Sequence, residues 1–542
     1  MVRAGENLQE GRVMAASRRE FLKRSAAATA GVVVGAPLLS ACGGSGSGSS
    51  PGSSASSAAT GTPVRGGRLR LAITGGGSSD QLNPLTSVNN ADYARARALF
   101  NQLASTSAAG DPVLELAEEI TPNRDLTEWT VRLRKGVLFH DGKEMTADDL
   151  IYTLQTVFNP KAPATAAGPL KALELKRVKK RDPYTLTLPL SSPSAILVQT
   201  LAAAGLAVIP VGFDTKRPIG TGPFRYVSFT PGAQSTFDRF ADYWDAPKPY
   251  IDQLVITDYT DETSQLNALT SGQADLANGL SVTGAQQAAA EGAHVVYSPG
   301  GGWNPFTMRV DVKPFSDVRV RQAMRLIVDR PQMQEVVFGG HGELASDVFG
   351  IWAPEFDHDL PQRHQDIPQA KSLLKAAGYS DLTVQLTTSD IAQGVVNMAQ
   401  IFVEQAKSAG VTVTLNQVTP TDFYGPNYLK WVFAQDYWYY NYYLGQVSTA
   451  TLPSAPFNET HFDNPTYNSL FAQAVKQPDL TKRADIAHEM QMIDYNEGGY
   501  IIPFFVPVID GFAVKVHGPG VEPSKVGASF NDWDFSSVWI KS

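Results

Sequence analysis

Short alternating runs and longer runs with helical spacing follow one another along most of the chain. Alternating or short apolar runs predict strands at residues 68–73, 129–134, 184–190, 250–259, 411–418 and 500–505. Apolar residues at helical spacing predict helices at residues 261–272, 316–329, 368–377, 391–410 and 481–496. A further helix is expected to begin at Thr146, because Asp149 completes a capping-box pattern. Strands and helices are interleaved throughout, so we expect an α/β or α+β fold.

The body of the chain is too long for one hydrophobic core. Domains seldom exceed about 250–300 residues, so a chain of 542 residues predicts two or three domains. Its hydrophobic fraction of 43% and charged fraction of 18% are typical of globular domains. After residue 42, no run of about 18 apolar residues occurs without a charge, so no membrane span is predicted there.

The first 42 residues have the layout of an export signal. Basic residues precede a weakly apolar stretch at 26–39, and small residues lead to Cys42. The pair Arg18 and Arg19, followed by Phe-Leu-Lys, resembles a twin-arginine signal. Cys42 follows Leu-Ser-Ala as in a lipobox, where the thiol receives a diacylglyceryl group. We therefore expect a signal peptide at residues 1–42 and lipidation of Cys42, the alternative being a chance thiol beside an ordinary cleavage site.

A segment of low complexity follows the predicted signal. Residues 43–64 contain almost only Gly, Ser, Ala, Thr and Pro, which predicts a flexible linker. Such a coil has a root-mean-square reach of about 26 Å. A lipid, a linker and a globular body together indicate a protein that works outside the cytoplasm, anchored to the outer face of the cytoplasmic membrane.

Composition and motifs exclude several functions. Beyond residue 41 the chain carries 39 Lys and Arg against 50 Asp and Glu, whereas nucleic-acid binding needs a basic face. No nucleophile elbow, zinc-protease motif or phosphate-binding loop occurs, so we expect neither an enzyme nor a bound cofactor. Residues 356–366 hold five His and Asp side chains that could ligate a transition metal, but a solvated loop is the better interpretation, and no metal site is expected.

Four stretches of the body are similar to one protein family. The most specific is residues 126–154, which include the run WTVRLRKGVLFHDGKEMTADDL, and residues 218–277 contain GTGPF and LNALTSGQADLA. The others are residues 313–333 and 368–379. In this order and spacing, the chain resembles the family 5 extracellular solute-binding proteins, which include receptors for oligopeptides, dipeptides and nickel. The resemblance covers essentially residues 65–540.

The resemblance implies the architecture and the partners. The expected fold is the two-lobed, hinged one of class II periplasmic binding proteins. The first lobe comprises residues 65–300 and 503–542, with an extra subdomain at about 109–207, and the second lobe comprises residues 301–502. A monomer is expected to capture a small molecule or short peptide between the lobes and deliver it to ABC permease subunits with cytoplasmic ATPases. A sensor that binds a peptide without transport is the alternative.

An aromatic segment, residues 437–443, is the main candidate for ligand contact. Neighbouring side chains of an extended segment point to opposite sides, so all these rings cannot face one core. By the resemblance this region lies in the second lobe and faces the cleft, and residues at the crossover between lobes also reach it. The predicted ligand-binding residues are Trp303, Asn304, Tyr437, Trp438, Tyr439, Tyr440 and Asn441.

The aromatic segment departs from the family pattern for peptides. Peptide receptors of this family carry a Gly-Trp-x-x-Asp-Tyr-like pattern whose Asp anchors the amino terminus of the peptide. Here Asp436 precedes the aromatic run, and Asn441 stands in or near the place of the expected acid. A neutral amide binds an ammonium less well than a carboxylate does. A peptide is the ligand that the family favours, and a sugar, an opine-like or an aromatic compound is the alternative.

Overall fold

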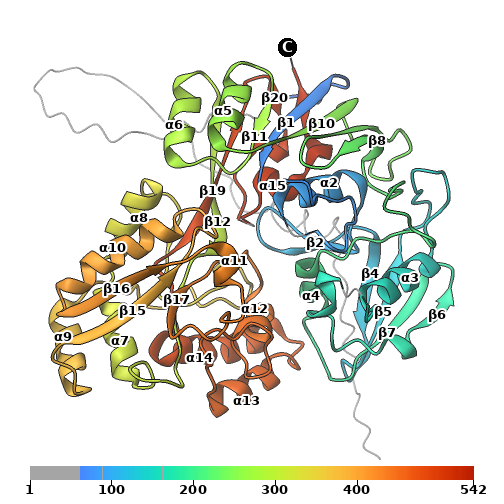
Figure 1. Cartoon of the computed structure of the whole chain (residues 1–542). Helices are drawn as coiled ribbons and strands as arrows, with labels where there is room; N and C mark the ends of the chain where they lie inside the picture. The colour runs from blue at the N-terminus through green and yellow to red at the C-terminus, as the bar shows by residue number, and fades with distance from the viewer. Residues whose placement is uncertain (1–60, 88, 162–163, 526, 542) are drawn as a thin grey trace, which may run out of the picture. The chain divides into compact units, whose positions relative to one another are not determined.

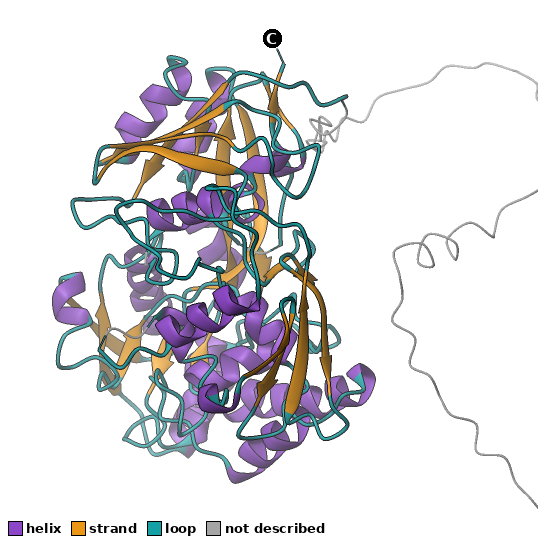
Figure 2. Ribbon diagram, turned by 90° about the vertical axis from the view of Figure 1, so that its right-hand side faces the viewer, coloured by secondary structure: helices purple, strands orange, loops and turns teal. Residues whose placement is uncertain are grey.

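Strands of the described residues fall into three sheets and two strand pairs (Figure 1). The structure is a computed structural model that describes residues 61–87, 89–161, 164–525 and 527–541. Arg18, Arg19 and Cys42 lie outside the described residues. Helices and strands are mixed along the described chain, which confirms the predicted α/β class (Figure 2).

The largest sheet of the described chain is built mainly from the first lobe. Its strand order is β12-β19-β11-β1-β10-β9-β8, with β14 paired to β19. The strands are β1 (Arg68–Thr74), β8 (Phe224–Thr230), β9 (Gln234–Arg239), β10 (Gln253–Tyr259), β11 (Leu276–Ala277), β12 (His294–Trp303), β14 (Glu343–Leu344) and β19 (Phe504–Phe512). Leu71, Ala72 and Ile73 of β1 are all buried, so both faces of this parallel strand are covered. The covering helices of this lobe are α2 (Asn90–Leu99), α5 (Glu262–Thr270) and α6 (Val282–Ala290).

A four-stranded antiparallel sheet lies within the stretch expected to form the extra subdomain. Its order is β4-β5-β7-β6, and the neighbouring pair is β2-β3. These elements are β2 (Ala104–Thr106), β3 (Pro112–Leu114), β4 (Ala117–Pro122), β5 (Glu128–Leu133), β6 (Lys179–Asp182), β7 (Thr185–Pro189), α3 (Ala147–Val157) and α4 (Leu197–Ala204). The Asp149 carboxylate accepts the backbone N–H of Thr146 at 2.9 Å, which confirms the predicted start of α3.

The second lobe contains a five-stranded sheet in the order β16-β15-β17-β13-β18, counted over the described residues. Its strands are β13 (Phe306–Met308), β15 (Leu382–Thr388), β16 (Val411–Gln417), β17 (Phe433–Gln435) and β18 (Tyr500–Ile501). Its helices are α7 (Val318–Ile327), α8 (Arg330–Phe338), α9 (Ile367–Ala376), α10 (Val395–Lys407), α11 (Pro420–Phe423), α12 (Tyr443–Ala450), α13 (Pro465–Ala474) and α14 (Leu480–Glu497). Figure 1 shows α9 and α10 beside β15 and β16.

Short elements complete the described chain. They are η1 (Thr165–Ala167), η2 (Leu175–Arg177), η3 (Pro519–Val521), η4 (Phe535–Ser537), α15 (Ser529–Trp533), β20 (Val516–His517) and β21 (Trp539–Ile540). None of the helices that the structure describes combines the length and apolar character needed to cross a bilayer.

Strands β12 and β19 run antiparallel beside each other and lead from one large sheet to the other. Trp303 ends β12 three residues before β13 begins at Phe306. The pairing passes from Ser298 opposite Val508 to Gly302 opposite Val506, with an irregularity between them. Gly300 has a φ of +67°, and a Cβ there would lie 2.2 Å from the Val506 carbonyl oxygen. Only glycine fits this close approach of the two strands.

The predicted strand at residues 500–505 is wrong as a single element. Residues 500–501 form β18, which pairs with β13 in the second-lobe sheet. Residues from Phe504 onward form β19, which pairs with β12 in the first-lobe sheet. Pro503 lies between the two strands and has no N–H to donate to a ladder, so the chain changes sheets there.

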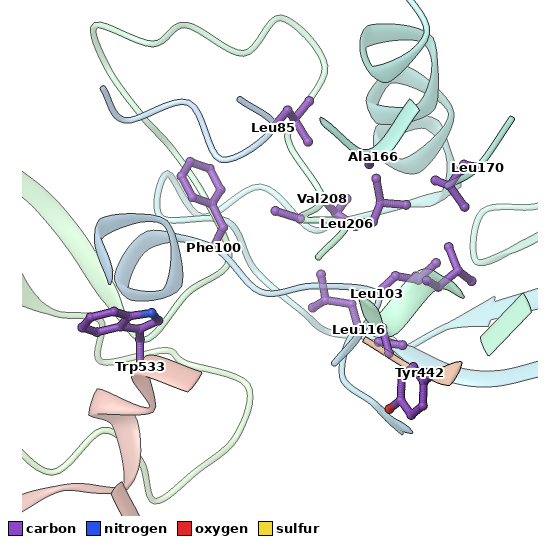
Figure 3. Packing of buried hydrophobic residues seen from close by; sticks show 14 of the residues in the cluster. Leu85, Phe100, Leu103, Leu116, Ala166, Leu170, Leu206, Val208, Tyr442 and Trp533 are labelled. Atoms are coloured by element: carbon purple, nitrogen blue, oxygen red, sulfur yellow. The ribbon is translucent and has the colours of Figure 1, made fainter. Parts of the chain in front are cut away.

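The largest hydrophobic cluster reaches beyond one lobe. It combines first-lobe residues such as Leu103 and Leu116 with Tyr442 and Tyr443 of the second lobe. Figure 3 shows Tyr442 and Trp533 among the buried side chains of this cluster. The Tyr442 hydroxyl also donates to Thr106 Oγ1 at 3.3 Å. The segment from 437 to 443 therefore contacts both lobes.

A buried ion-pair network fixes α2 against the first-lobe sheet. The Arg95 guanidinium lies 2.7 Å from Asp80 Oδ2 and 2.6 Å from Asp258 Oδ1. Its Nε also donates to Ser235 Oγ at 3.0 Å. The side chains of Arg95 and Asp80 are fully buried, and that of Asp258 is 4% exposed. Removing the arginine would leave two buried carboxylates without their cation.

We predict that Arg95→Met lowers the free energy of unfolding of the first lobe by about 3–5 kcal/mol, because a broken buried pair leaves uncompensated charge. Urea denaturation monitored by tryptophan fluorescence measures the loss. Arg132→Met is the matched control, since Arg132 pairs with Glu119 at the surface where both side chains are 47% exposed. A similar loss in both variants would contradict the role of burial.

Candidate functional site

A cavity of 480 Å³ lies where the two lobes meet the crossing strands. The first lobe contributes α2, the end of α4 and the α15 turn, and the second lobe contributes residues 392–393 and 437–440. Strand β12 and residues 506–509 of β19 also line it. A cavity of this volume, lined by small apolar residues, eight aromatic residues and a few polar groups, is typical of small-molecule sites.

The aromatic segment is held extended at the cavity by a backbone bridge. The N–H of Trp303 donates to the Trp438 carbonyl and the N–H of Trp438 to the Trp303 carbonyl, each at 2.9 Å. This bridge continues the pairing of β13 with β17. Side chains of an extended segment alternate, so Trp438 points away from its neighbours Tyr437 and Tyr439.

Trp438 packs into the interior on its side of the segment. Its ring stacks on Trp303 at 5.9 Å and 19°. Its Nε1 donates to Glu459 Oε1 at 2.9 Å. Burial raises the pKa of Glu459 well above its usual value. The Trp438 ring therefore belongs to a buried polar and aromatic network, although its edge reaches the cavity.

Trp303 and Asn304 line the cavity but are almost fully buried. Trp303 is 1% exposed and stacks on Phe349 at 5.3 Å, with Tyr500 at its edge. Asn304 is 3% exposed, and its Nδ2 donates to the Gln393 carbonyl at 3.0 Å. Both side chains are mainly packing residues in this conformation.

Tyr437, Tyr439 and Tyr440 present their rings to the cavity. Tyr437 and Tyr439 pack edge to face at 5.5 Å, and Tyr439 is 54% exposed. The Tyr440 hydroxyl donates to the Gly110 carbonyl of the first lobe at 3.4 Å. Among the predicted residues, these three rings have the surface that is most accessible to a bound molecule.

Asn441 and Asp436 are not among the residues that line the cavity. Asp436 is 2% exposed and accepts the Tyr424 hydroxyl at 2.7 Å and the backbone N–H of Tyr437 at 2.8 Å. Burial raises its pKa to about 6. Its Oδ2 has no hydrogen-bond partner among the described residues. In this conformation Asp436 lies behind the rings rather than at the cavity wall.

Two charged residues, Arg97 and Asp532, lie among the described residues that line the cavity. Arg97 Nη2 lies 2.8 Å from Glu115 Oε1, and its Nε lies 3.5 Å from Asp532 Oδ2. Burial opposes ionisation of Glu115, but Arg97 outweighs it and lowers the pKa of that carboxyl. Burial raises the pKa of Asp532 to about 6, with Glu115 and Asp534 adding to the shift against Arg97.

Asp532 lies on a left-handed turn, which gives α15 an unusual backbone. Phe530, Asn531, Asp532 and Trp533 have φ of 54°, 53°, 61° and 59°. Such a conformation costs an L-residue roughly 1–2 kcal/mol. The Asp510 carboxylate of β19 supports it, because Oδ2 accepts the Phe530 N–H at 3.0 Å. Asp510 Oδ1 accepts the Gly279 N–H at 3.1 Å, so one carboxylate joins β19, the turn and the loop after β11.

The cavity is also lined by four residues that the sequence did not predict as site residues: Tyr93, Arg97, Asp532 and Trp533. Arg97 has the spacing of an ordinary helix residue, and Asp532 belongs to no recognised motif. No local signal separates them from other residues of their types. Only the packing of α15 on α2 brings them together.

The loop at residues 356–366 holds five His and Asp side chains. Within the described ranges, no group of three or more His, Cys, Asp or Glu side chains is arranged to hold a metal ion. Asp357 Oδ1 instead accepts the backbone N–H of Asp359 at 3.0 Å.

Known proteins share the sequence and the fold. The model of the bacterial extracellular solute-binding proteins, family 5 Middle, matches residues 111–469. A dipeptide-binding protein from Pseudomonas aeruginosa is 26% identical over 355 residues, which cover 60% of this chain and 66% of that relative. The chain thus aligns with about two thirds of the relative's length.

Two solved structures show the same architecture. The periplasmic binding protein DppA from Helicobacter pylori, in complex with the peptide STSA, has a TM-score of 0.74 at 18% identity and covers 88% of this chain and 99% of its own. NikZ from Campylobacter jejuni, in complex with Ni(L-His), has a TM-score of 0.73 at 16% identity, covering 87% and 99%. These likenesses confirm the predicted two-lobed fold.

We predict that Trp438→Ala lowers the free energy of unfolding by about 3–5 kcal/mol, because it removes the ring that stacks on Trp303 and the shorter of the two hydrogen bonds to Glu459. Tyr439→Ala should change it by about 0.5 kcal/mol or less, because more than half of that side chain is exposed. Thermal and urea unfolding of both variants measure the difference. Equal losses would show that the two neighbours do not face opposite environments.

Proposed function

Because this chain belongs to the bacterial extracellular solute-binding proteins of family 5, we propose that it is a receptor that captures one small solute between its lobes and delivers it to the membrane permease of an ABC importer. The observation that carries this proposal is the 480 Å³ cavity, whose wall is shared by both lobes and the crossing strands. A solute that contacts both lobes at once stabilises the closed form, so capture and closure are coupled.

A short peptide is the first ligand class to test. One relative is named a dipeptide-binding protein, and one structural neighbour contains the peptide STSA. Another neighbour contains Ni(L-His), so the fold also takes solutes that are not peptides. The burial of Asp436 behind Tyr437 supports the expectation that a peptide amine would need a different anchor here.

The N-terminal motifs support a place of action outside the cytoplasm. Arg18 and Arg19 would direct export, and lipidation of Cys42 would anchor the receptor to the outer face of the cytoplasmic membrane. Residues 43–64 would then act as a tether to a monomeric receptor. A tethered receptor stays close to its permease, which raises its effective concentration there.

The direct test is to purify the protein from cells without added ligand, denature it, and identify any released small molecule by mass spectrometry. A peptide would support the peptide form of the proposal, and another solute would support the receptor role with a different ligand. A sample that releases nothing and binds nothing in a thermal-shift screen of peptides, sugars and amines would overturn it.

We predict that Tyr439→Ala weakens binding of the identified solute by about tenfold or more, because burying a large apolar side chain against a solute contributes roughly 1.5–3 kcal/mol. Isothermal titration calorimetry measures the affinity. Tyr226→Ala is the matched control, since Tyr226 of β8 is 37% exposed and does not line the cavity. Unchanged affinity in Tyr439→Ala would remove the aromatic segment from the binding site.

We also predict that Cys42→Ala releases the receptor from the membrane fraction without abolishing export, because the thiol is the acceptor of the lipid. Fractionation of cells and metabolic labelling with a fatty acid measure anchoring. Ser40→Ala leaves the cysteine in place and serves as the control. Continued membrane retention of Cys42→Ala would contradict lipid anchoring.

A further inference from the structure

At the cavity, Asp532 shares its nearest cation, Arg97, with Glu115. Arg97 contacts Glu115 through both terminal nitrogens, at 2.8 and 3.3 Å. Its Nε donates to the backbone carbonyl of Asp532 at 3.3 Å and lies 3.5 Å from the Asp532 carboxylate, which is longer than a typical hydrogen bond. The Asp532 carboxylate accepts no hydrogen bond from the residues that the structure describes, and its side chain is 31% exposed. Together Arg97, Glu115 and Asp532 carry a net charge of about −1 when all are ionised.

Aromatic rings line the same cavity as this carboxylate. Tyr93 of α2 and Trp533 of the left-handed turn line the cavity from the first lobe, and Tyr437 and Tyr439 line it from the second. Tyr93 is 38% exposed, so its ring offers surface to a bound molecule. Aromatic faces attract cations, and carboxylates complete the sites that bind ammonium groups. The cavity thus combines the two recognition elements for a cationic nitrogen.

A second cavity adjoins the first at Asp532. It has a volume of 190 Å³ and shares Arg97, Thr106, Asp532 and Trp533 with the first. The charged side chains that line it are Arg97, Glu115, Asp245, Lys248, Asp532 and Asp534. Acidic side chains outnumber basic ones in this second cavity, so its electrostatic potential also favours a positively charged ligand group.

We infer that the solute captured by this receptor carries a positively charged nitrogen, which docks between Asp532 and the rings of Tyr93, Tyr437 and Tyr439. The inference rests on the proposed function and adds the chemical class of the ligand. The nitrogen belongs either to a peptide amine or to a free organic cation, since both present the same charge to the carboxylate. The cation would contact Asp532 in the first lobe and Tyr437 and Tyr439 in the second. Because it contacts both lobes at once, it favours the closed form.

The ionisation of Asp532 makes this recognition sensitive to pH. Burial raises its pKa to about 6, Glu115 and Asp534 add to the shift, and Arg97 opposes it. Tyr93, the other titratable group facing it from α2, stays neutral in this range because burial raises its pKa. Asp532 is therefore charged at about pH 7.5 and mostly neutral at about pH 5, so cation binding weakens as the pH falls through its pKa.

The test uses pairs of probes that differ in charge and little in shape. Choline is compared with its neutral isostere 3,3-dimethylbutan-1-ol, and trialanine with N-acetyltrialanine, by calorimetry on the protein purified from cells. We expect at least one cationic member to bind about tenfold or more tightly than its neutral partner at about pH 7.5. The first pair reports a free organic cation and the second a peptide amine. Any solute released from the purified protein is examined for a cationic nitrogen as well.

Asp532→Asn removes the charge and keeps the backbone, because Asn tolerates a positive φ at least as well as Asp. We expect it to lower the preference for the cationic probe by about tenfold and to abolish the loss of affinity at acid pH. Asp381→Asn, an exposed acid outside both cavities, should leave the preference unchanged. Circular dichroism and thermal unfolding verify that both variants are folded.

Equal affinity for charged and neutral probes, or a released solute without a cationic nitrogen, would overturn the inference and leave the receptor role intact. A charge preference that persists in Asp532→Asn would also overturn it, because another group would then select the cation. Binding of no solute of any kind would overturn both this inference and the proposed function.

Discussion

The antiparallel pairing of β12 with β19 is the constraint on which the cavity depends. The two strands approach so closely at Gly300 that a side chain would collide with the Val506 carbonyl. Each strand then supports one wall. Trp303 at the end of β12 bridges the backbone of Trp438, and Asp510 on β19 holds the left-handed turn that carries Asp532. The same pair of strands thus positions both walls of the cavity, although the walls belong to different lobes.

The aromatic segment serves two purposes because its side chains alternate. Trp438 faces the interior, where it stacks on Trp303 and donates to the buried Glu459. Its neighbour Tyr439 faces the cavity and is largely exposed. A binding surface made of rings would move if the backbone beneath it were free. The backbone bridge to Trp303 and the stacking of Trp438 stiffen that backbone, and so Tyr439 is held in place before a solute arrives.

The electrostatic character of the cavity follows from how charges are shared. Arg97 lines the wall, yet most of its hydrogen-bonding capacity is directed to Glu115. A guanidinium engaged in this way offers little to an anionic solute. Asp532 keeps its place through backbone strain that Asp510 and the packing of Trp533 compensate. Strained segments of this kind often occur where a side chain must be presented at a functional site.

Several helices and strands, the class of fold and the family could be predicted from the sequence, because these depend on local spacing and on long ordered motifs. The start of α3 at Thr146 followed from its capping box, and the aromatic segment was visible as a run of rings. Local patterns could not divide residues 500–505 between two sheets, since strand pairing joins segments far apart in the chain. Nor could they predict that Arg97 lies beside Asp532, or that Trp438 packs on Trp303 while Tyr439 is exposed. Those relations were decided by tertiary packing alone, because burial and charge pairing are properties of neighbours in space.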